Sequence, residues 1–145
     1  MEPITVKYKV LDARAKVPAY ATPGAAAADL CAVLDAPLTV APMQRVLVPT
    51  GLAIELPGAH AVALVYARSG LSIKHGLCMA NGVGVVDSDY RGELKVPMIN
   101  LGPRPIPSSP VSVWHSSALH RCIPLPLLRR LNWGIPSAAR AALAQ

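Results

Sequence analysis

The chain has 145 residues, a length typical of one domain with a sizeable hydrophobic core. It contains no run of about 18 apolar residues, so we expect neither a membrane-spanning helix nor a membrane partner. The formal net charge of +6 would suit a nucleic-acid-binding protein, but the distribution of this charge, described below, argues against that class.

Short apolar runs with turn residues between them predict an all-β fold. Residues 4–10 alternate apolar and polar side chains with a period of two, residues 38–56 contain two apolar runs, and residues 61–66 and 95–99 add two more. Gly and Pro turns separate these runs, and no long amphipathic helix is expected before Pro103. The spacing indicates a sandwich, a jelly roll or a barrel.

The composition changes at Pro103. Residues 1–102 contain nine Lys or Arg and all eight acids, whereas residues 103–145 contain five Arg, no Lys, no acid and seven of the fifteen prolines. The leucines and tryptophans of the second segment are not typical of a nucleic-acid-binding arm, so no nucleic-acid partner is expected. Its prolines forbid a regular helix near residues 103–110 and disfavour a central strand.

Two features indicate a cytoplasmic location. The first residues lack the apolar stretch of a secretory signal. Three cysteines without CxxC spacing, Cys31, Cys78 and Cys122, predict reduced thiols in place of disulfides or a zinc site.

Arg68, Ser69 and Gly70 form a candidate phosphate-binding turn. They place a bidentate donor, a hydroxyl and a permissive backbone in consecutive positions, which suits phosphate oxygens. An ordinary turn is the alternative for this tripeptide. Asn81-Gly82 is either a plain hairpin turn or the edge of a cradle for a flat base.

Asp87 and Asp89 follow a predicted strand and would project to the same face. One carboxylate there would activate a water beside a metal-bound phosphate chain. The alternative is a pair of ordinary turn acids, and Tyr90 taken alone would be a packing aromatic.

Three segments together resemble the trimeric deoxyuridine triphosphate nucleotidohydrolase (dUTPase) family. They are PGAAAADLCA, ARSGLSIKHG and NGVGVVDSDYRGE, and the resemblance covers residues 1–102. It implies a dUTPase-like jelly roll of the β-clip type, assembled as a homotrimer with active sites between subunits. It also implies hydrolysis of dUTP to dUMP and pyrophosphate with Mg²⁺, which limits uracil in DNA and supplies dUMP.

The resemblance also implies residue roles. Asp87 would deprotonate the water that attacks the α-phosphorus and would face the sugar 3′-hydroxyl, and Tyr90 would lie under the deoxyribose and exclude a ribose. The remaining substrate contacts would come from Asn81, Val85 and Val86 at the uracil, from Arg68, Ser69 and Gly70 at the phosphates, and from Lys95. Asp29 would hold the hydrated magnesium indirectly, through water.

The chain departs from the family pattern in three places. Ala27 replaces a usual Gly, and Ala67 replaces a usual Pro. The fourth motif, near Gly-x-Arg-Ile-Ala-Gln, and the fifth, a Gly-rich segment with Arg and Phe, are absent, and the chain contains no Phe. We therefore divide the chain into a dUTPase-like β core, 1–102, and an aberrant Pro/Arg-rich tail, 103–145, expected to be disordered or poorly packed.

A shifted reading frame would account for the tail. SAARAALAQ (137–145) has synonymous codons that regroup into Arg-Gly-Glu-Gly-Gly-Phe-Gly-Ser-Thr, which is the fifth motif. VSVWHSS (111–117) regroups with the same offset into Glu-Arg-Met-Ala-Gln-Leu, which is the fourth. The hypothesis predicts weak or absent activity and poor solubility, because the family's last strands and closing arm would be missing.

Three alternative functions remain open from the sequence. A non-catalytic remnant of the family would bind nucleotide or only assemble. A dCTP deaminase-like enzyme fits the second and third segments less well, because deamination needs a different acid–base set at the base. A basic nucleic-acid-binding module would require the tail and would bind DNA in a salt-sensitive way.

Overall fold

The computed structural model of this chain describes residues 5–108 and 113–120. Within these residues the protein consists of strands joined by short loops, with one α-helix and one 3₁₀ helix. Their bounds are β1 (Lys7–Val10), β2 (Ala19–Tyr20), β3 (Ala28–Cys31), β4 (Leu38–Val40), β5 (Arg45–Pro49), β6 (Leu52–Glu55), η1 (Gly58–His60), β7 (Val62–Ala67), α1 (Ser69–His75), β8 (Leu77–Met79), β9 (Gly84–Val86), β10 (Lys95–Asn100), β11 (Ile106–Ser108) and β12 (Val113–His120).

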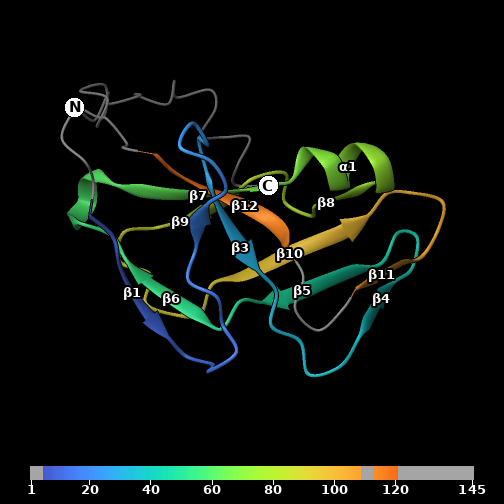
Figure 1. The fold of residues 1–145 in the computed structure, drawn as a ribbon, viewed down its shortest axis with the longest axis horizontal. Helices are drawn as coiled ribbons and strands as arrows, with labels where there is room; N and C mark the ends of the chain where they lie inside the picture. The colour runs from blue at the N-terminus through green and yellow to red at the C-terminus, as the bar shows by residue number, and fades with distance from the viewer. Residues whose placement is uncertain (1–4, 109–112, 121–145) are drawn as a thin grey trace, which may run out of the picture.

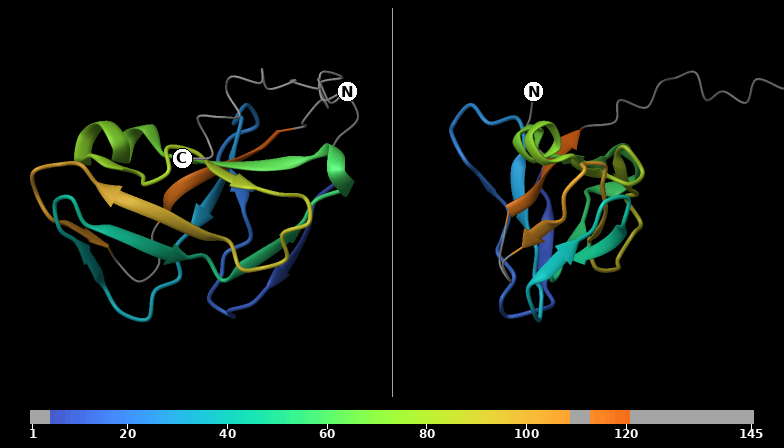
Figure 2. Two further views of the ribbon diagram at one scale, coloured as in Figure 1. Left: turned by 180° about the vertical axis from the view of Figure 1, so that it is seen from behind. Right: turned by 90° about the vertical axis from the view of Figure 1, so that its right-hand side faces the viewer.

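The strands form four antiparallel sheets, two large and two small (Figure 1). The largest has the order β2-β3-β12-β7-β9, and a three-stranded sheet has the order β5-β10-β8. Two ribbons, β1-β6 and β11-β4, complete the structure. The views in Figure 2 place α1 at one end of the molecule, near the end of β10. The predicted all-β class is confirmed.

One hydrophobic core lies between the two large sheets. Leu30 and Val65 come from the five-stranded sheet, and Val48, Leu77 and Met98 come from the three-stranded sheet. All five are buried, and the last three are nearly completely excluded from solvent. The alternation of buried and exposed positions along β10 follows the period of two expected of a strand with one covered face.

The strands with a clear alternating or apolar pattern were predicted correctly. Residues 7–10, 38–40, 45–49, 52–55, 62–67 and 95–100 are strands within or beside the predicted runs. The short strands β2, β3 and β8 were not predicted, whereas β9 is the strand expected just before Asp87. Ile4, the first residue of the first predicted run, lies outside the described residues.

A short helix occupies the position where the sequence suggested a turn. Ser69 begins α1, and Gly76 ends it in the left-handed region with φ of 76°. The backbone of Gly76 lies directly against the backbone of Gly102, and the Leu101 N–H donates to the Gly76 carbonyl at 2.8 Å. A glycine is therefore required here by both the φ angle and the close approach.

Part of the tail forms strands, where the prolines suggested an irregular segment. β11 pairs with β4 at the edge of a small sheet, which is where a strand can contain Pro107. The backbone of β12 pairs with both β3 and β7. Backbone hydrogen bonds do not depend on side-chain identity, so a segment without clear periodicity can occupy the position between these strands. Residues 121–145 of the predicted aberrant tail lie outside the described residues.

Within the described part of the chain, no helix has the length and apolar character needed to cross a bilayer.

Candidate active site

A cavity of about 390 Å³ lies beside Val65 of β7 and is bounded by β9 and the start of β10. Most of the predicted substrate residues line it. They are Asn81, Val85, Val86, Asp87, Tyr90 and Lys95. Six of the predicted substrate residues, all between positions 81 and 95, therefore lie around one cavity.

β9 places the predicted catalytic carboxylate at the edge of this cavity. Gly84 packs so closely on Val65 of β7 that a Cβ at Gly84 would lie 3.1 Å from the Val65 Cβ. Asp87 directly follows β9, and the Tyr90 N–H donates to the Asp87 carbonyl at 3.2 Å. This hydrogen bond closes a turn over residues 87–90 and sets Tyr90 beside Asp87.

Two details of the sequence interpretation were wrong in this region. Asp89 does not line the cavity with Asp87, because residues 87–90 form a turn and the strand period no longer applies. The segment around Asn81 is not a simple hairpin either. β8 pairs with β10 and β9 pairs with β7, so the loop at Asn81 connects strands of two different sheets.

A network of hydrogen bonds fixes the wall of the cavity that follows Tyr90. The Tyr90 hydroxyl donates to the Glu93 carbonyl at 2.9 Å, and the Gly51 N–H donates to Glu93 Oε1 at 2.9 Å. Lys95 Nζ lies 3.4 Å from Glu93 Oε2. The buried Thr50 hydroxyl donates to the Leu94 carbonyl at 2.7 Å. Residues 90–95 are therefore tied to the β5–β6 turn.

The predicted phosphate donors line a different cavity. Arg68, Ser69 and Gly70 border an open hollow of about 790 Å³ at the start of α1. The N–H groups of Ser69 and Gly70 belong to the first helical turn, where the helix supplies no acceptors for them. Phosphate oxygens are suitable acceptors for such groups. Within one chain, the predicted phosphate donors therefore line a different cavity from the one that contains Asp87.

Asp29 lies beside the phosphate donors. Its side chain is mostly buried on β3, and Asp29 Oδ2 lies 3.7 Å from Arg68 Nη1. β12 runs between β3 and β7, with Ser116 paired to both Asp29 and Tyr66, so this ion pair crosses the central strand. The predicted magnesium carboxylate and a predicted phosphate donor are thereby brought together.

The donor set of the described residues suits a hydrated magnesium ion carried by a phosphate chain. The described part of the chain contains no group of three or more His, Cys, Asp or Glu that could hold a metal. Mg²⁺ keeps several waters and commonly uses one or two carboxylates together with substrate phosphates. A single carboxylate, Asp29, beside the phosphate donor Arg68 fits that mode of binding.

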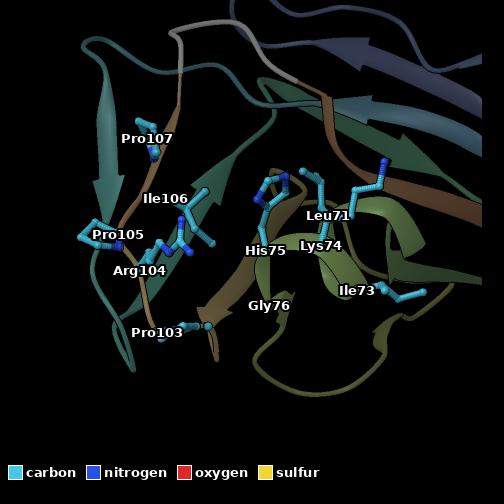
Figure 3. Close-up of a pocket in the computed structure, with 11 residues that line it drawn as sticks. Leu71, Ile73, Lys74, His75, Gly76, Pro103, Arg104, Pro105, Ile106 and Pro107 are labelled. Carbon is cyan, nitrogen blue, oxygen red and sulfur yellow. The ribbon is translucent and has the colours of Figure 1, made fainter.

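A further cavity of about 700 Å³ lies between α1 and residues 102–107 (Figure 3). His75 and Arg104 face the same gap from opposite walls, and Ile106 lies between them. None of the residues predicted for the site lines this cavity.

The two cysteines in the described residues are free thiols, as predicted, and Cys122 lies outside those residues. Cys31 is buried, and this burial raises the pKa of its thiol. A protonated, buried thiol is a poor nucleophile, so covalent chemistry at Cys31 is not supported.

The sequence interpretation missed the residues that support the site. Gly92 and Glu93 lie in the third motif, but nothing in their pattern indicated contacts with Tyr90 and Gly51. Thr50 follows β5 as an ordinary polar residue, yet it is fully buried. The available signal was the Thr-Gly dipeptide inside the second apolar run predicted for residues 38–56, because the structure divides that run into β5 and β6 at this point.

Comparison with known proteins identifies relatives of this chain. The family model for dUTPase matches residues 13–108. A deoxyuridine 5′-triphosphate nucleotidohydrolase of Desulfitobacterium hafniense (strain DSM 10664 / DCB-2) is 58% identical over 102 residues, which cover 70% of this chain and 68% of the relative. The protein of the same name from Bordetella pertussis is 48% identical over 109 residues, which cover 74% of this chain and 73% of the relative.

Solved structures support the fold. A dUTPase from phage phi11 of S. aureus, studied for the coordination of a structural Mg(II) ion, superposes with a TM-score of 0.71 at 17% identity. That similarity covers 81% of this chain and 90% of the phage chain. A Staphylococcus bacteriophage 80alpha dUTPase with dUpNHpp gives a TM-score of 0.72 at 17% identity, over 81% and 82% of the two chains.

Proposed function

The chain belongs to the dUTPase family, and we propose that its site is built to hydrolyse dUTP to dUMP and pyrophosphate. The observation that carries this proposal is the cavity at β9, where Asp87, Tyr90 and Asn81 converge with Lys95. The curated relatives carry the name of this activity, and the dCTP deaminase alternative receives no comparable support.

Asp87 is the general base of the proposed reaction. It is exposed at the cavity edge directly after β9, where a water can reach it. A carboxylate in this position takes a proton from the water as that water attacks the α-phosphorus. General-base catalysis of this kind contributes about 10² to 10⁴-fold to the rate.

Tyr90 and Asn81 select the nucleoside. The Tyr90 ring, fixed by its hydroxyl bond to the Glu93 carbonyl, lies under the deoxyribose and leaves no room for a 2′-hydroxyl. The Asn81 side chain and the backbone at Val85 and Val86 read the uracil edge, where the close backbone excludes a thymine methyl. A clash against the wrong ligand is an effective source of specificity.

Arg68, Ser69 and Gly70 would bind the phosphate chain, and Asp29 would hold a hydrated Mg²⁺ through water. The ion pair of Arg68 with Asp29 sets the guanidinium toward this site before substrate arrives. When bound, Mg²⁺ neutralises phosphate charge. The protein donors orient the chain for in-line attack.

A complete site needs more than one chain. Asp87 and the phosphate donors line separate cavities of one chain, so the proposed homotrimer would join the two halves across a subunit interface. Val85 and Leu47 are both about 60% exposed beside the Asp87 cavity. Apolar side chains exposed in this way suit a surface covered by another subunit. A cytoplasmic location is part of this proposal, since Cys31 and Cys78 are free thiols.

The tail lowers the activity expected of this chain. The match to the family model ends at residue 108, which lies inside the interval where a frame shift was inferred. The nucleotide sequence between the codons for Asn100 and Val111 tests this, and codons at Ala142-Leu143 that cannot regroup into the fifth motif would refute it.

A pyrophosphate-release assay with dUTP and Mg²⁺ tests the function. We expect little or no turnover by this chain and substantial turnover by the chain expressed with the family reading frame restored. Equal, near-normal turnover by both would refute the importance of the tail. Stable folding and dUTP binding without hydrolysis by either chain would select the non-catalytic alternative.

A further inference from the structure

Gly92 lies directly against the ring of Tyr90. A Cβ at Gly92 would lie 2.5 Å from Tyr90 Oη, 2.7 Å from Cζ and 3.1 Å from Cε2. These distances are well inside the contact distance of non-bonded atoms. Gly92 is not one of the glycines with a left-handed φ, so its backbone conformation would accept any residue. Glycine is therefore required at position 92 by contact with the Tyr90 ring and not by the backbone conformation of the turn.

The ring is fixed on its other sides. Its hydroxyl donates to the Glu93 carbonyl at 2.9 Å, and Glu93 is itself anchored by the Gly51 N–H and by Lys95. The Tyr90 N–H donates to the Asp87 carbonyl at 3.2 Å. The Tyr90 backbone is therefore tied to the Asp87 backbone, and the ring is tied through Glu93 to the β5–β6 turn.

We propose that Gly92 is a positioning residue for sugar specificity, because the absence of a side chain lets Tyr90 lie where it excludes a ribose. This inference rests on the proposed function. Tyr90 is 45% exposed, and the atoms that a new Cβ would meet are at the far end of its side chain. The ring would therefore move and the backbone would not, so Gly92→Ala should fold and lose discrimination.

Calorimetric binding of α,β-imido-dUTP and α,β-imido-UTP, each with Mg²⁺, tests this on the chain as it exists. We expect Gly92→Ala to lower the ratio of dUTP-analogue to UTP-analogue affinity by about tenfold or more. Gly24→Ala is the matched control, since a Cβ at Gly24 meets no atom within 4 Å. An unchanged ratio in Gly92→Ala would overturn the inference, as would a variant that fails to fold.

An NMR spectrum recorded without nucleotide tests the position of the Tyr90 ring independently of the proposed function. In protein labelled with ¹³C at the tyrosine Cζ, the Tyr90 resonance is identified by its loss in Tyr90→Phe. We expect this resonance to shift in Gly92→Ala and to stay in place in Gly24→Ala. Protein with the family reading frame restored that binds neither analogue would contradict the proposed function. An unshifted Tyr90 resonance would overturn the positioning role.

Discussion

Two asparagines illustrate how position decides the role of a residue. Asn81 is exposed at the edge of the Asp87 cavity, whereas Asn100 is completely buried at the end of β10. The Asn100 amide donates to the Val40 carbonyl at 2.9 Å and to the Arg104 carbonyl at 2.8 Å, and its Oδ1 accepts from the Gly102 N–H at 2.8 Å. Asn100 therefore satisfies three buried or half-buried backbone groups, whereas the exposed Asn81 side chain is at the cavity where the proposed function places the base.

We predict that Asn100→Ala lowers the free energy of unfolding by about 2–4 kcal/mol, because three backbone groups lose a partner. Asn81→Ala should change stability by less than about 0.5 kcal/mol, as exposed substitutions usually do, and should weaken dUTP binding about tenfold or more. Urea denaturation and calorimetry measure the two effects. Equal losses of stability in the two variants would contradict this separation of roles.

At the scale of elements, the loop after β1 is held by a network of three charged residues. Arg14 lies 2.7 Å from Asp12 and 2.8 Å from Asp35. The side-chain hydrogen bond from Arg14 lowers the pKa of Asp12 from 3.8 to about 2. A carboxyl whose pKa is lower in the folded state stabilises the fold above pH 3.8, and that contribution is lost as the pH falls toward 2.

We therefore predict that Arg14→Gln flattens the dependence of stability on pH between 4 and 2. The thermal midpoint of the wild type should fall over this range more than that of the variant, because the variant has no Arg14 to lower the pKa of Asp12. Arg45→Gln is the control, since Arg45 makes no ion pair among the described residues. Parallel curves for the wild type and Arg14→Gln would count against the network.

The end of α1 gives a second prediction at this scale. Gly76 has φ of 76° and lies against Gly102, so a methyl group would meet backbone atoms that cannot move independently. We predict that Gly76→Ala lowers the free energy of unfolding by about 2 kcal/mol or more. Gly24→Ala should be nearly neutral. A Gly76→Ala protein as stable as the wild type in urea would show that the two loops separate easily.

For the whole molecule, the sequence was sufficient for the all-β class and for the residues around Asp87. The alternating pattern of β10 and the apolar run of β7 identified those strands, and the third motif identified the cavity lining. The sequence was not sufficient for α1, whose seven residues include none that is buried. Without a buried face, a helix of this length has no apolar periodicity to detect.

The pairing of strands was also beyond prediction, for a physical reason. Backbone N–H and C=O groups form the hydrogen bonds between strands. The position of β12 between β3 and β7 could therefore not be predicted from its amino-acid sequence. The separation of Arg68 from the Asp87 cavity follows from these long-range pairings. The motifs place all these residues in one predicted site, whereas within one chain they line two separate cavities.

The most direct test of the account is the turnover of dUTP by the frame-restored chain with Asp87 and with Asp87→Asn. The amide keeps the shape of the side chain and removes its ability to take a proton from water. We predict that the pyrophosphate-release rate falls about 10² to 10⁴-fold while affinity for the imido analogue of dUTP changes little. An amide variant that retains the turnover of its parent would contradict the assignment of Asp87 as the general base.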